Sequence, residues 1–108
     1  MNKKKMNDIF TISKVFASSK RLLILEILSK EPIGYTEITN CFNGYGIPIG
    51  SSEMYKHLDI LINNGFVSKK KESSYGKYFI TKKGMVAVDK IKEIAGTEAK
   101  VAKIRMEF

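Results

Sequence analysis

The most regular helical pattern in this sequence is Ser51-Ser-Glu-Met-Tyr-Lys-His-Leu-Asp-Ile-Leu-Ile-Asn-Asn-Gly65. Met54, Leu58 and Leu61 recur in it at spacings of four and three, which places them on one face of a helix. Gly65 follows the last apolar residue and suits the left-handed position that commonly ends a helix. The pattern therefore predicts a helix with one buried face and one exposed, mostly polar face.

Two more helices are predicted nearer the N-terminus. The first begins at Asn7, which can cap it, and it carries four apolar residues on one face: Ile9, Ile12, Val15 and Phe16. The second begins at Ser18 or Ser19 and ends before Pro32, because the residue before a proline is disfavoured in helical geometry.

Shorter elements are predicted between Pro32 and Ser51. Residues 33–35 are expected to be extended, and Thr36 can cap a short helix, Glu37–Phe42. Asn43–Gly50 is rich in glycine and other turn formers, so we expect a loop there.

The segment after Gly65 predicts a β-hairpin and a last helix. Residues 66–71 and 77–81, which include Phe66, Val67 and the run Tyr78-Phe-Ile-Thr81, lie on either side of the turn Glu72–Gly76. Thr81 then caps a long helix that runs to about Ile104, and Gly96 could interrupt it. This element order is that of a winged helix-turn-helix, a mainly α fold with a small β-hairpin (α+β) that forms the wing.

The charge of the chain indicates a polyanionic partner. The chain carries 19 Lys and Arg against 11 Asp and Glu, a formal net charge of +8. Cations that neutralise phosphates release counterions, which favours binding to nucleic acid. A solvated basic surface without a ligand is the alternative.

With 108 residues, 44% of them hydrophobic, we expect one small domain whose stability would gain from pairing with a second copy.

Cysteine content and the N-terminus exclude several classes of protein. Cys41 is the only cysteine, so no internal disulfide can form, and one Cys with one His cannot make a four-ligand zinc site. We expect Cys41 to be a small buried apolar residue rather than a redox switch. The lysines near the N-terminus precede no apolar stretch that would make a signal peptide or a membrane span. We therefore expect a cytoplasmic protein with no membrane partner, no metal and no cofactor.

Three stretches of the sequence together resemble ArsR-type regulators. Phe16–Leu28 resembles their second-helix region, and Ser51–Val67 resembles their recognition helix and its exit into the wing. Tyr78–Gly84 is similar to the end of the wing in such proteins, including PadR- and MarR-type ones. The resemblance covers about residues 16–84 and implies a DNA-binding transcriptional regulator. Two features depart from it, because Asn43–Gly50 is longer than the usual turn and the metal-sensing Cys-x-Cys pair is missing.

A recognition helix contacts bases with the exposed residues of its first turns. Here these are Ser51, Ser52, Glu53, Tyr55 and Lys56, with His57 and Asp59 at the margin. Serine, lysine and tyrosine can bind phosphates or base edges. Glu53 could accept a hydrogen bond from a cytosine amine, or it could only stabilise the helix N-terminus. His57 borders the apolar face, so a partly buried histidine is favoured over a phosphate contact and over a metal ligand.

The predicted wing is basic. Its candidate DNA contacts are Lys69, Lys70, Lys71, Tyr75 and Lys77. Such residues can contact phosphates or the minor groove, although lysines also keep an edge strand soluble. The wing contains no arginine, so we expect it to supply affinity more than specificity. Lys20 and Arg21, at the start of the second helix, are expected to touch the DNA backbone.

The two ends of the chain are expected to form a homodimer interface. The last helix carries Ile91, Ile94, Val101 and Ile104 at spacings of three, seven and three, which is close to a heptad seam. The apolar residues expected to join it from the first helix are Ile9, Ile12 and Phe16. The alternative is that the last helix folds back on its own core. A two-fold dimer would present two recognition helices to a pseudo-palindromic DNA site.

These features divide the chain into a flexible basic N-terminus (1–6), a winged helix-turn-helix domain (7–84) and a dimerisation helix (85–108). The favoured function is a sequence-specific regulator that binds double-stranded DNA. The alternatives are an architectural protein that coats DNA without sequence preference, and a winged-helix module for protein interaction. The sequence has no phosphate-binding glycine loop, nucleophile elbow or metal-ligand cluster, so we expect no enzyme. It indicates no effector and no target.

Overall fold

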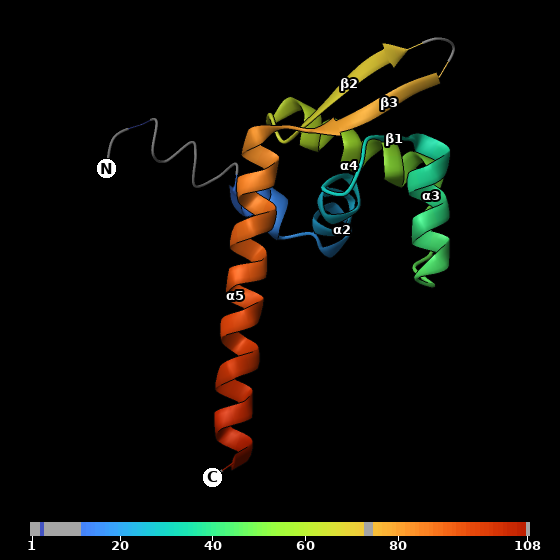
Figure 1. The fold of residues 1–108 in the computed structure, drawn as a ribbon. Coiled ribbons are helices and arrows are strands. Elements are labelled where there is room, and N and C mark those ends of the chain that lie inside the picture. The colour runs from blue at the N-terminus through green and yellow to red at the C-terminus, as the bar shows by residue number, and fades with distance from the viewer. Residues whose placement is uncertain (1–2, 4–11, 73–74, 108) are drawn as a thin grey trace.

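The chain folds into a group of helices with a small sheet along one end, as a computed structural model shows (Figure 1). The structure describes residues 3, 12–72 and 75–107, and at residues 71, 72, 75 and 97–107 it describes the backbone alone. Residues 12–16 are helical. The further elements are α2 (Ser19–Leu28), β1 (Ile33–Gly34), α3 (Tyr35–Gly44), α4 (Ser51–Asn63), β2 (Val67–Glu72), β3 (Tyr75–Ile80) and α5 (Lys82–Glu107). Their arrangement confirms the predicted winged helix-turn-helix fold (Figure 1).

The sheet has three antiparallel strands in the order β1-β3-β2. Strands β2 and β3 form the predicted hairpin, with Val67 opposite Ile80 and Glu72 opposite Tyr75. The predicted turn Glu72–Gly76 was therefore too long, because strand pairing continues to the Glu72–Tyr75 pair. The short β1 pairs with β3 through Ile33 and Tyr78, so the wing is anchored to the residues just before α3.

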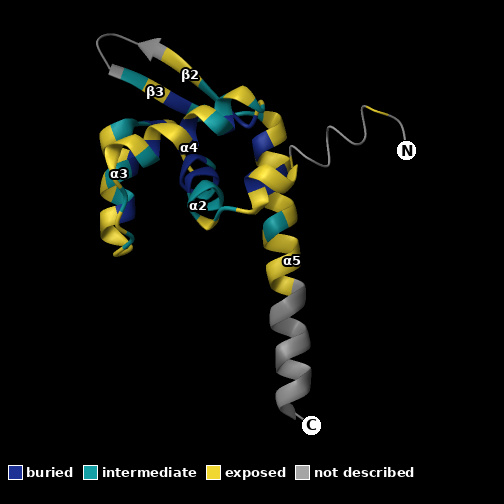
Figure 2. Cartoon of the chain, turned by 180° about the vertical axis from the view of Figure 1, so that it is seen from behind, coloured by how far each residue is buried: buried dark blue, intermediate teal, exposed yellow. Residues whose placement is uncertain are grey.

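The apolar face predicted for α4 lies in the centre of the core. Met54, Leu58 and Leu61 are fully buried, as are side chains from α2 and α3, including Leu25 and Phe42. Figure 2 shows buried residues gathered where α2, α3 and α4 meet beneath the sheet. Burying such side chains contributes about 1.5–3 kcal/mol each, so this contact stabilises the fold substantially.

Helix α3 begins two residues earlier than the sequence predicted. Its N-cap is Gly34 rather than Thr36, and its helical residues run from Tyr35 to Gly44. The carboxylate of Glu37 reaches back and accepts a hydrogen bond from the Gly34 N–H at 3.4 Å, which satisfies a backbone donor before the first turn. By contrast, the predicted start of α2 is confirmed, because the helix begins at Ser19 and the Ser18 hydroxyl caps it by accepting from the Arg21 N–H.

A compact junction joins the end of α4 to the wing and to the start of α5. Gly65 has a φ of +82°, the left-handed conformation predicted for it. The Thr81 hydroxyl donates to the Gly65 carbonyl at 2.6 Å and accepts from the Gly84 N–H at 3.1 Å, so it also caps α5. A Cβ at Gly84 would overlap the Phe66 carbonyl oxygen, so a larger residue would push α5 away from the hairpin.

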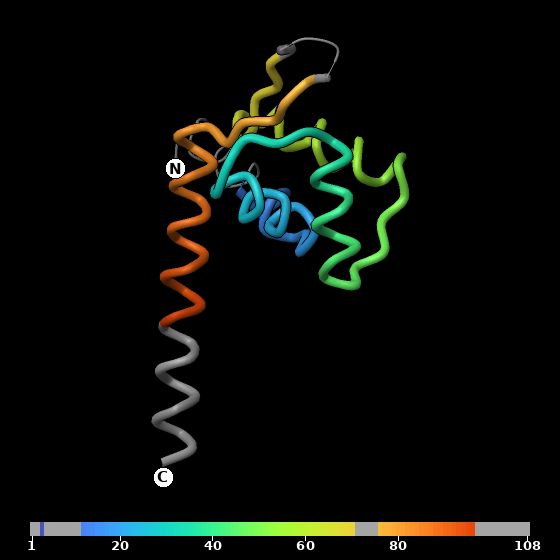
Figure 3. Tube along the Cα trace, turned by 45° about the vertical axis from the view of Figure 1, so that its right-hand side comes forward, coloured from blue at the N-terminus to red at the C-terminus, as the bar shows by residue number. Residues whose placement is uncertain are grey.

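Helix α5 leaves the body of the protein. Its first turns pack on α2 through buried Ala87 and Val88, and Lys92 reaches Glu26 of α2 at 3.5 Å. The remainder runs on beyond the other helices, as Figures 1 and 3 show from two directions. The break that the sequence allowed at Gly96 does not occur, because the helix is continuous through it for 26 residues in total. At 1.5 Å per residue it is about 39 Å long.

Candidate nucleic-acid interface

The N-terminal turns of α4 present a polar surface. Ser51, Ser52, Tyr55 and Lys56 are all exposed, as the sequence predicted, while Met54 between them faces the core. The N-cap is Gly50, which has no side chain to occupy the free N–H groups of the first turn. Free N–H groups at a helix N-terminus bind anions, so this end of α4 suits contact with a polyanion.

Glu53 lies on the side of α4 that faces α2. Its two carboxylate oxygens accept hydrogen bonds from the Lys20 ammonium at 2.9 and 3.0 Å. The hydrogen bond from Lys20 holds the pKa of Glu53 below its ordinary value. Contacts of Glu53 with a base and of Lys20 with the DNA backbone stay predictions, and in this structure the two side chains neutralise each other.

His57 and Arg21 complete this group of charged side chains. His57 is 7% exposed, and its Nδ1 accepts a hydrogen bond from Arg21 Nε at 3.1 Å. The Arg21 guanidinium also donates to the Lys14 carbonyl, so it bridges three segments. Burial, and then the positive charge of Arg21, lower the pKa of His57 and favour its neutral form. We call Lys20, Arg21, Glu53 and His57 the polar cluster.

These contacts determine which ring nitrogen of neutral His57 carries the proton. Because Nδ1 accepts from Arg21, the ring proton resides on Nε2. That buried nitrogen has no hydrogen-bond partner among the described residues and lies 3.6 Å from a Glu53 oxygen. His57 is therefore the partly buried histidine that the sequence favoured, and Arg21 supports it from α2.

The wing carries exposed lysines along both strands. Lys69, Lys70 and Lys77 are exposed, and Lys70 lies directly opposite Lys77 in the antiparallel register. Like charges in that position repel, so a bound anion would relieve the repulsion. The Lys69 and Lys70 ammonium groups lie over the rings of Tyr78 and Phe79, at 5.4 and 5.3 Å. The side chains of two further predicted contacts, Lys71 and Tyr75, lie outside the described residues.

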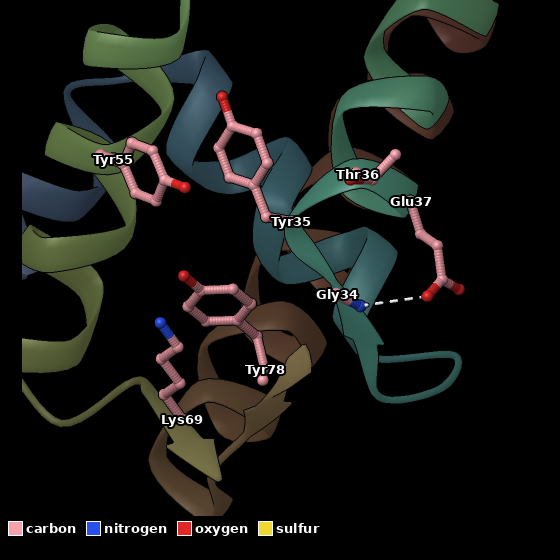
Figure 4. A pocket seen from close by; sticks show the side chains of 8 residues that line it. Gly34, Tyr35, Thr36, Glu37, Tyr55, Lys69 and Tyr78 are labelled. Carbon is pink, nitrogen blue, oxygen red and sulfur yellow. Dashed lines mark hydrogen bonds between the residues drawn. The ribbon is translucent and has the colours of Figure 1, made fainter. Parts of the chain in front are cut away.

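A groove lies between α4 and the wing, and the sequence did not reveal it. Its volume is about 380 Å³, and it is lined by Gly34, Tyr35, Thr36, Glu37, Tyr55, Lys69, Gly76 and Tyr78 (Figure 4). Tyr35 at the start of α3 stacks on Tyr55 of α4, with ring centroids 4.5 Å apart and planes inclined by 12°. We call this hollow the tyrosine groove. The sequence placed Tyr35 in an extended segment, so it gave no reason to pair it with Tyr55.

An apolar surface lies near the start of α5, away from the tyrosine groove. Ile12 and Phe16 are 42% and 37% exposed, and they line an apolar hollow of about 190 Å³ with Phe66 and Val86. Further along α5, Ile91 is half-buried and Ile94 is 57% exposed. Three other residues predicted for the dimer interface lie outside the residues whose side chains are described: Ile9, Val101 and Ile104.

The described part of the chain has neither a metal-binding cluster nor a membrane-spanning helix. Within residues 12–70 and 76–96 no cluster of three or more His, Cys, Asp or Glu side chains could hold a metal ion. None of the described helices is both long and apolar enough to cross a membrane. Cys41 is a half-buried free thiol, more exposed than the sequence predicted.

Comparison with known proteins identifies the fold. No protein-family model matches the sequence, and no curated protein matches it significantly. Among solved structures, RosR from H. salinarum is similar with a TM-score of 0.69 and 23% identity, over 83% of this chain and 91% of that one. The transcriptional repressor BigR from Xylella fastidiosa has a TM-score of 0.68 and 19% identity, over 87% and 96%.

A third similar structure is the homodimeric winged helix-turn-helix DNA-binding domain of Mb0332 from Mycobacterium bovis, a possible ArsR-family regulator. Its TM-score is 0.70 and its identity 18%, over 89% of this chain and 87% of that one. The chain thus has the winged helix-turn-helix fold of these proteins. The resemblance to ArsR-type regulators is confirmed at the level of the fold.

Proposed function

We propose that this protein is a transcriptional regulator that binds specific sequences of double-stranded DNA as a homodimer, and that it is not an enzyme. The observation that carries the proposal is the exposed polar N-terminus of α4 beside a wing that bears exposed lysines. BigR, which shares this fold, is a transcriptional repressor, and the Mb0332 domain is a DNA-binding one. The formal net charge of +8 adds a general attraction for DNA.

In this proposal α4 enters the major groove with its N-terminal end. Ser51, Ser52 and Lys56 contact base edges and the phosphates that flank them. The lysines of the wing contact the backbone or the minor groove, and they supply affinity that is independent of sequence. The wing has no arginine to form paired hydrogen bonds with guanine, so sequence preference comes mainly from α4.

The homodimer forms through the apolar residues near both ends of the chain. Ile12, Phe16 and Ile94 are exposed apolar side chains, and covering them with a second copy would remove them from water. Between residues 89 and 96 of α5 all side chains except the half-buried Ile91 are exposed, so its own chain leaves this stretch uncovered (Figure 2). The Mb0332 domain, of the same fold, is homodimeric.

Selection of bound duplexes from a random DNA pool tests the specificity. We expect an enriched pseudo-palindrome that binds about 10³-fold more tightly than random DNA, the lower end for specific binders. Both affinities are measured across a salt series, because the non-specific part weakens with salt. A ratio below about tenfold would instead identify an architectural protein that coats DNA.

The mass of the protein in solution tests the assembly. We expect a dimer at micromolar concentration, and Ile94→Lys should shift it towards the monomer because a charge cannot be buried in an apolar interface without a partner. Asp89→Lys, at an exposed position of the same helix outside the apolar hollow, also introduces a lysine; it is the matched control and should leave the dimer intact. A monomeric mass for the unaltered protein would refute the homodimer.

A further inference from the structure

The tyrosine groove holds hydrogen-bond donors that the protein itself does not satisfy. The hydroxyls of Tyr55 and Tyr78 and the ammonium of Lys69 make no hydrogen bond or ion pair with any described residue. The Tyr78 side chain as a whole is only 3% exposed, but its hydroxyl is not a fully buried atom, so the hydroxyl reaches the surface of the opening. In Figure 4 all three polar groups are directed into the same opening. Donors that line an opening and have no partner within the protein can bind an acceptor from outside it.

The one carboxylate that lines the groove is engaged elsewhere. Glu37 accepts a hydrogen bond from the Gly34 N–H, and Figure 4 shows it turned towards Gly34 and away from Lys69. The opening therefore combines neutral donors with one positive charge. Its chemistry suits a ligand that has several acceptor oxygens and a negative charge, which describes a phosphate group.

The surroundings keep this opening in place. The stack of Tyr35 on Tyr55 links α3 to α4, and the pairing of β1 with β3 brings Tyr78 next to the start of α3. Lys69 lies over the Tyr78 ring at 5.4 Å, which holds its ammonium at the opening. These donors come from α4, β2 and β3, so the site is formed by the fold before any ligand arrives.

We propose that the tyrosine groove binds one phosphate of the DNA backbone, with Lys69 supplying the charge and Tyr55 and Tyr78 donating hydrogen bonds. The inference rests on the proposed function, because the groove lies between the helix that enters the major groove and the wing. Tyr55 is then a backbone contact rather than a base contact. A phosphate held at this point fixes the register of α4 on the duplex without reading its sequence.

Chemical substitution of single phosphates tests the proposal on the selected duplex. Each phosphate is replaced in turn by a neutral methylphosphonate, and affinity is measured for the unaltered protein and for Tyr78→Phe. Tyr78→Phe removes the hydroxyl and keeps the ring, and we expect about tenfold weaker binding to every sequence. For the unaltered protein, a methylphosphonate at one phosphate per half-site should weaken binding by a similar factor. For Tyr78→Phe, the same methylphosphonate should weaken binding only slightly further. Tyr45→Phe, at a 61% exposed tyrosine outside the groove, is the control and should bind like the unaltered protein.

Lys69→Gln provides a second variant, because Lys69 is exposed and its replacement does not disturb the core. As with Tyr78→Phe, a methylphosphonate at that same phosphate should change its affinity only slightly. Losses that simply add for every phosphate, in both variants, would overturn the proposal and leave the proposed function intact. Failure of the unaltered protein to bind DNA would overturn both. A nucleoside monophosphate that binds the groove without competing with DNA would assign the groove to free nucleotides and also overturn the proposal.

Discussion

The polar groups on the two sides of α4 differ in whether they have partners within the protein. On the side that faces α2, the polar cluster pairs Lys20 with Glu53 and Arg21 with His57. On the side that faces the wing, Tyr55, Tyr78 and Lys69 point into an opening. Their hydrogen-bond donors have no acceptor among the described side chains. On the first side most of the polar groups are paired within the fold, with His57 Nε2 as the exception, and on the second side the donors are free to bind a ligand.

This difference separates residues that look equivalent in the sequence. Lys20, Arg21 and Lys69 are all cations close to the predicted DNA-binding surface. In the structure Lys20 and Arg21 hold α2 against α4, whereas Lys69 has no ion pair among the described residues. A cation that is already paired gains less from a phosphate, because its charge is partly neutralised before binding.

The largest effect is expected from Arg21→Met, which breaks the polar cluster. It leaves His57 Nδ1 buried without its donor, and an unsatisfied buried polar group costs about 1–3 kcal/mol of unfolding free energy. Urea denaturation measures the loss. Lys30→Met, at an exposed lysine in the turn that follows α2, is the control and should change stability by less than about 0.5 kcal/mol. Unchanged stability together with lost DNA affinity would show that Arg21 is a phosphate contact instead.

A smaller effect is expected from Lys69→Gln on the other side of α4. Binding to all sequences should weaken by about fivefold at moderate salt, and the salt slope should fall by about one unit, because one phosphate contact is lost. A salt titration of affinity checks this, and Lys30→Gln should leave the slope unchanged. A change in the preferred sequence would contradict the assignment of Lys69 to the backbone.

Glu53→Gln should act in the opposite direction and more weakly. The substitution removes a negative charge from the DNA-facing end of α4 and releases Lys20, so affinity should rise by about twofold for any duplex. Competition binding with selected and random duplexes measures this change. Loss of a cytosine preference at one position would show instead that Glu53 reads a base.

The smallest effect concerns pH. The pKa of His57 is lowered in the folded protein, first by burial and then by Arg21, so the unfolded chain binds more protons as the pH falls below about 6.5. Stability should therefore decrease as the pH falls through this range, and the lowered pKa of Glu53 should add a further decrease below about 4.5. Denaturation at several pH values measures the slope. In His57→Gln the first decrease should disappear, and its persistence would contradict the assignment.

Local patterns in the sequence predicted much of the fold. The buried face of α4 follows from the spacing of Met54, Leu58 and Leu61, and the hairpin follows from its aromatic and β-branched residues. The start of α3 was wrong because Gly34 has no side chain that marks a cap, and the cap depends on Glu37 reaching back. Such errors of two residues change which side chains face a site.

The candidate site was predictable only where it depends on one element. The exposed residues of α4 follow from its apolar periodicity. In the polar cluster, Lys20 pairs with Glu53 and Arg21 pairs with His57. The partners are separated by 33 and 36 positions in the chain, and no pattern in the sequence indicates these pairs. The tyrosine groove brings together α3, α4 and the wing, so its members become neighbours only through the packing of three elements.

The junction around Thr81 has a consequence for the geometry of a dimer. Thr81 bonds to Gly65 and Gly84, Lys83 donates to the Asn64 carbonyl at 3.0 Å, and the first turn of α5 is pressed against Phe66. The end of α4, the base of the wing and the start of α5 thus move as one rigid piece. In a homodimer built on α5, the crossing angle of the two helices would determine how many base pairs separate the half-sites. Changes in α5 could then alter the spacing of the recognised palindrome while leaving the recognised bases the same.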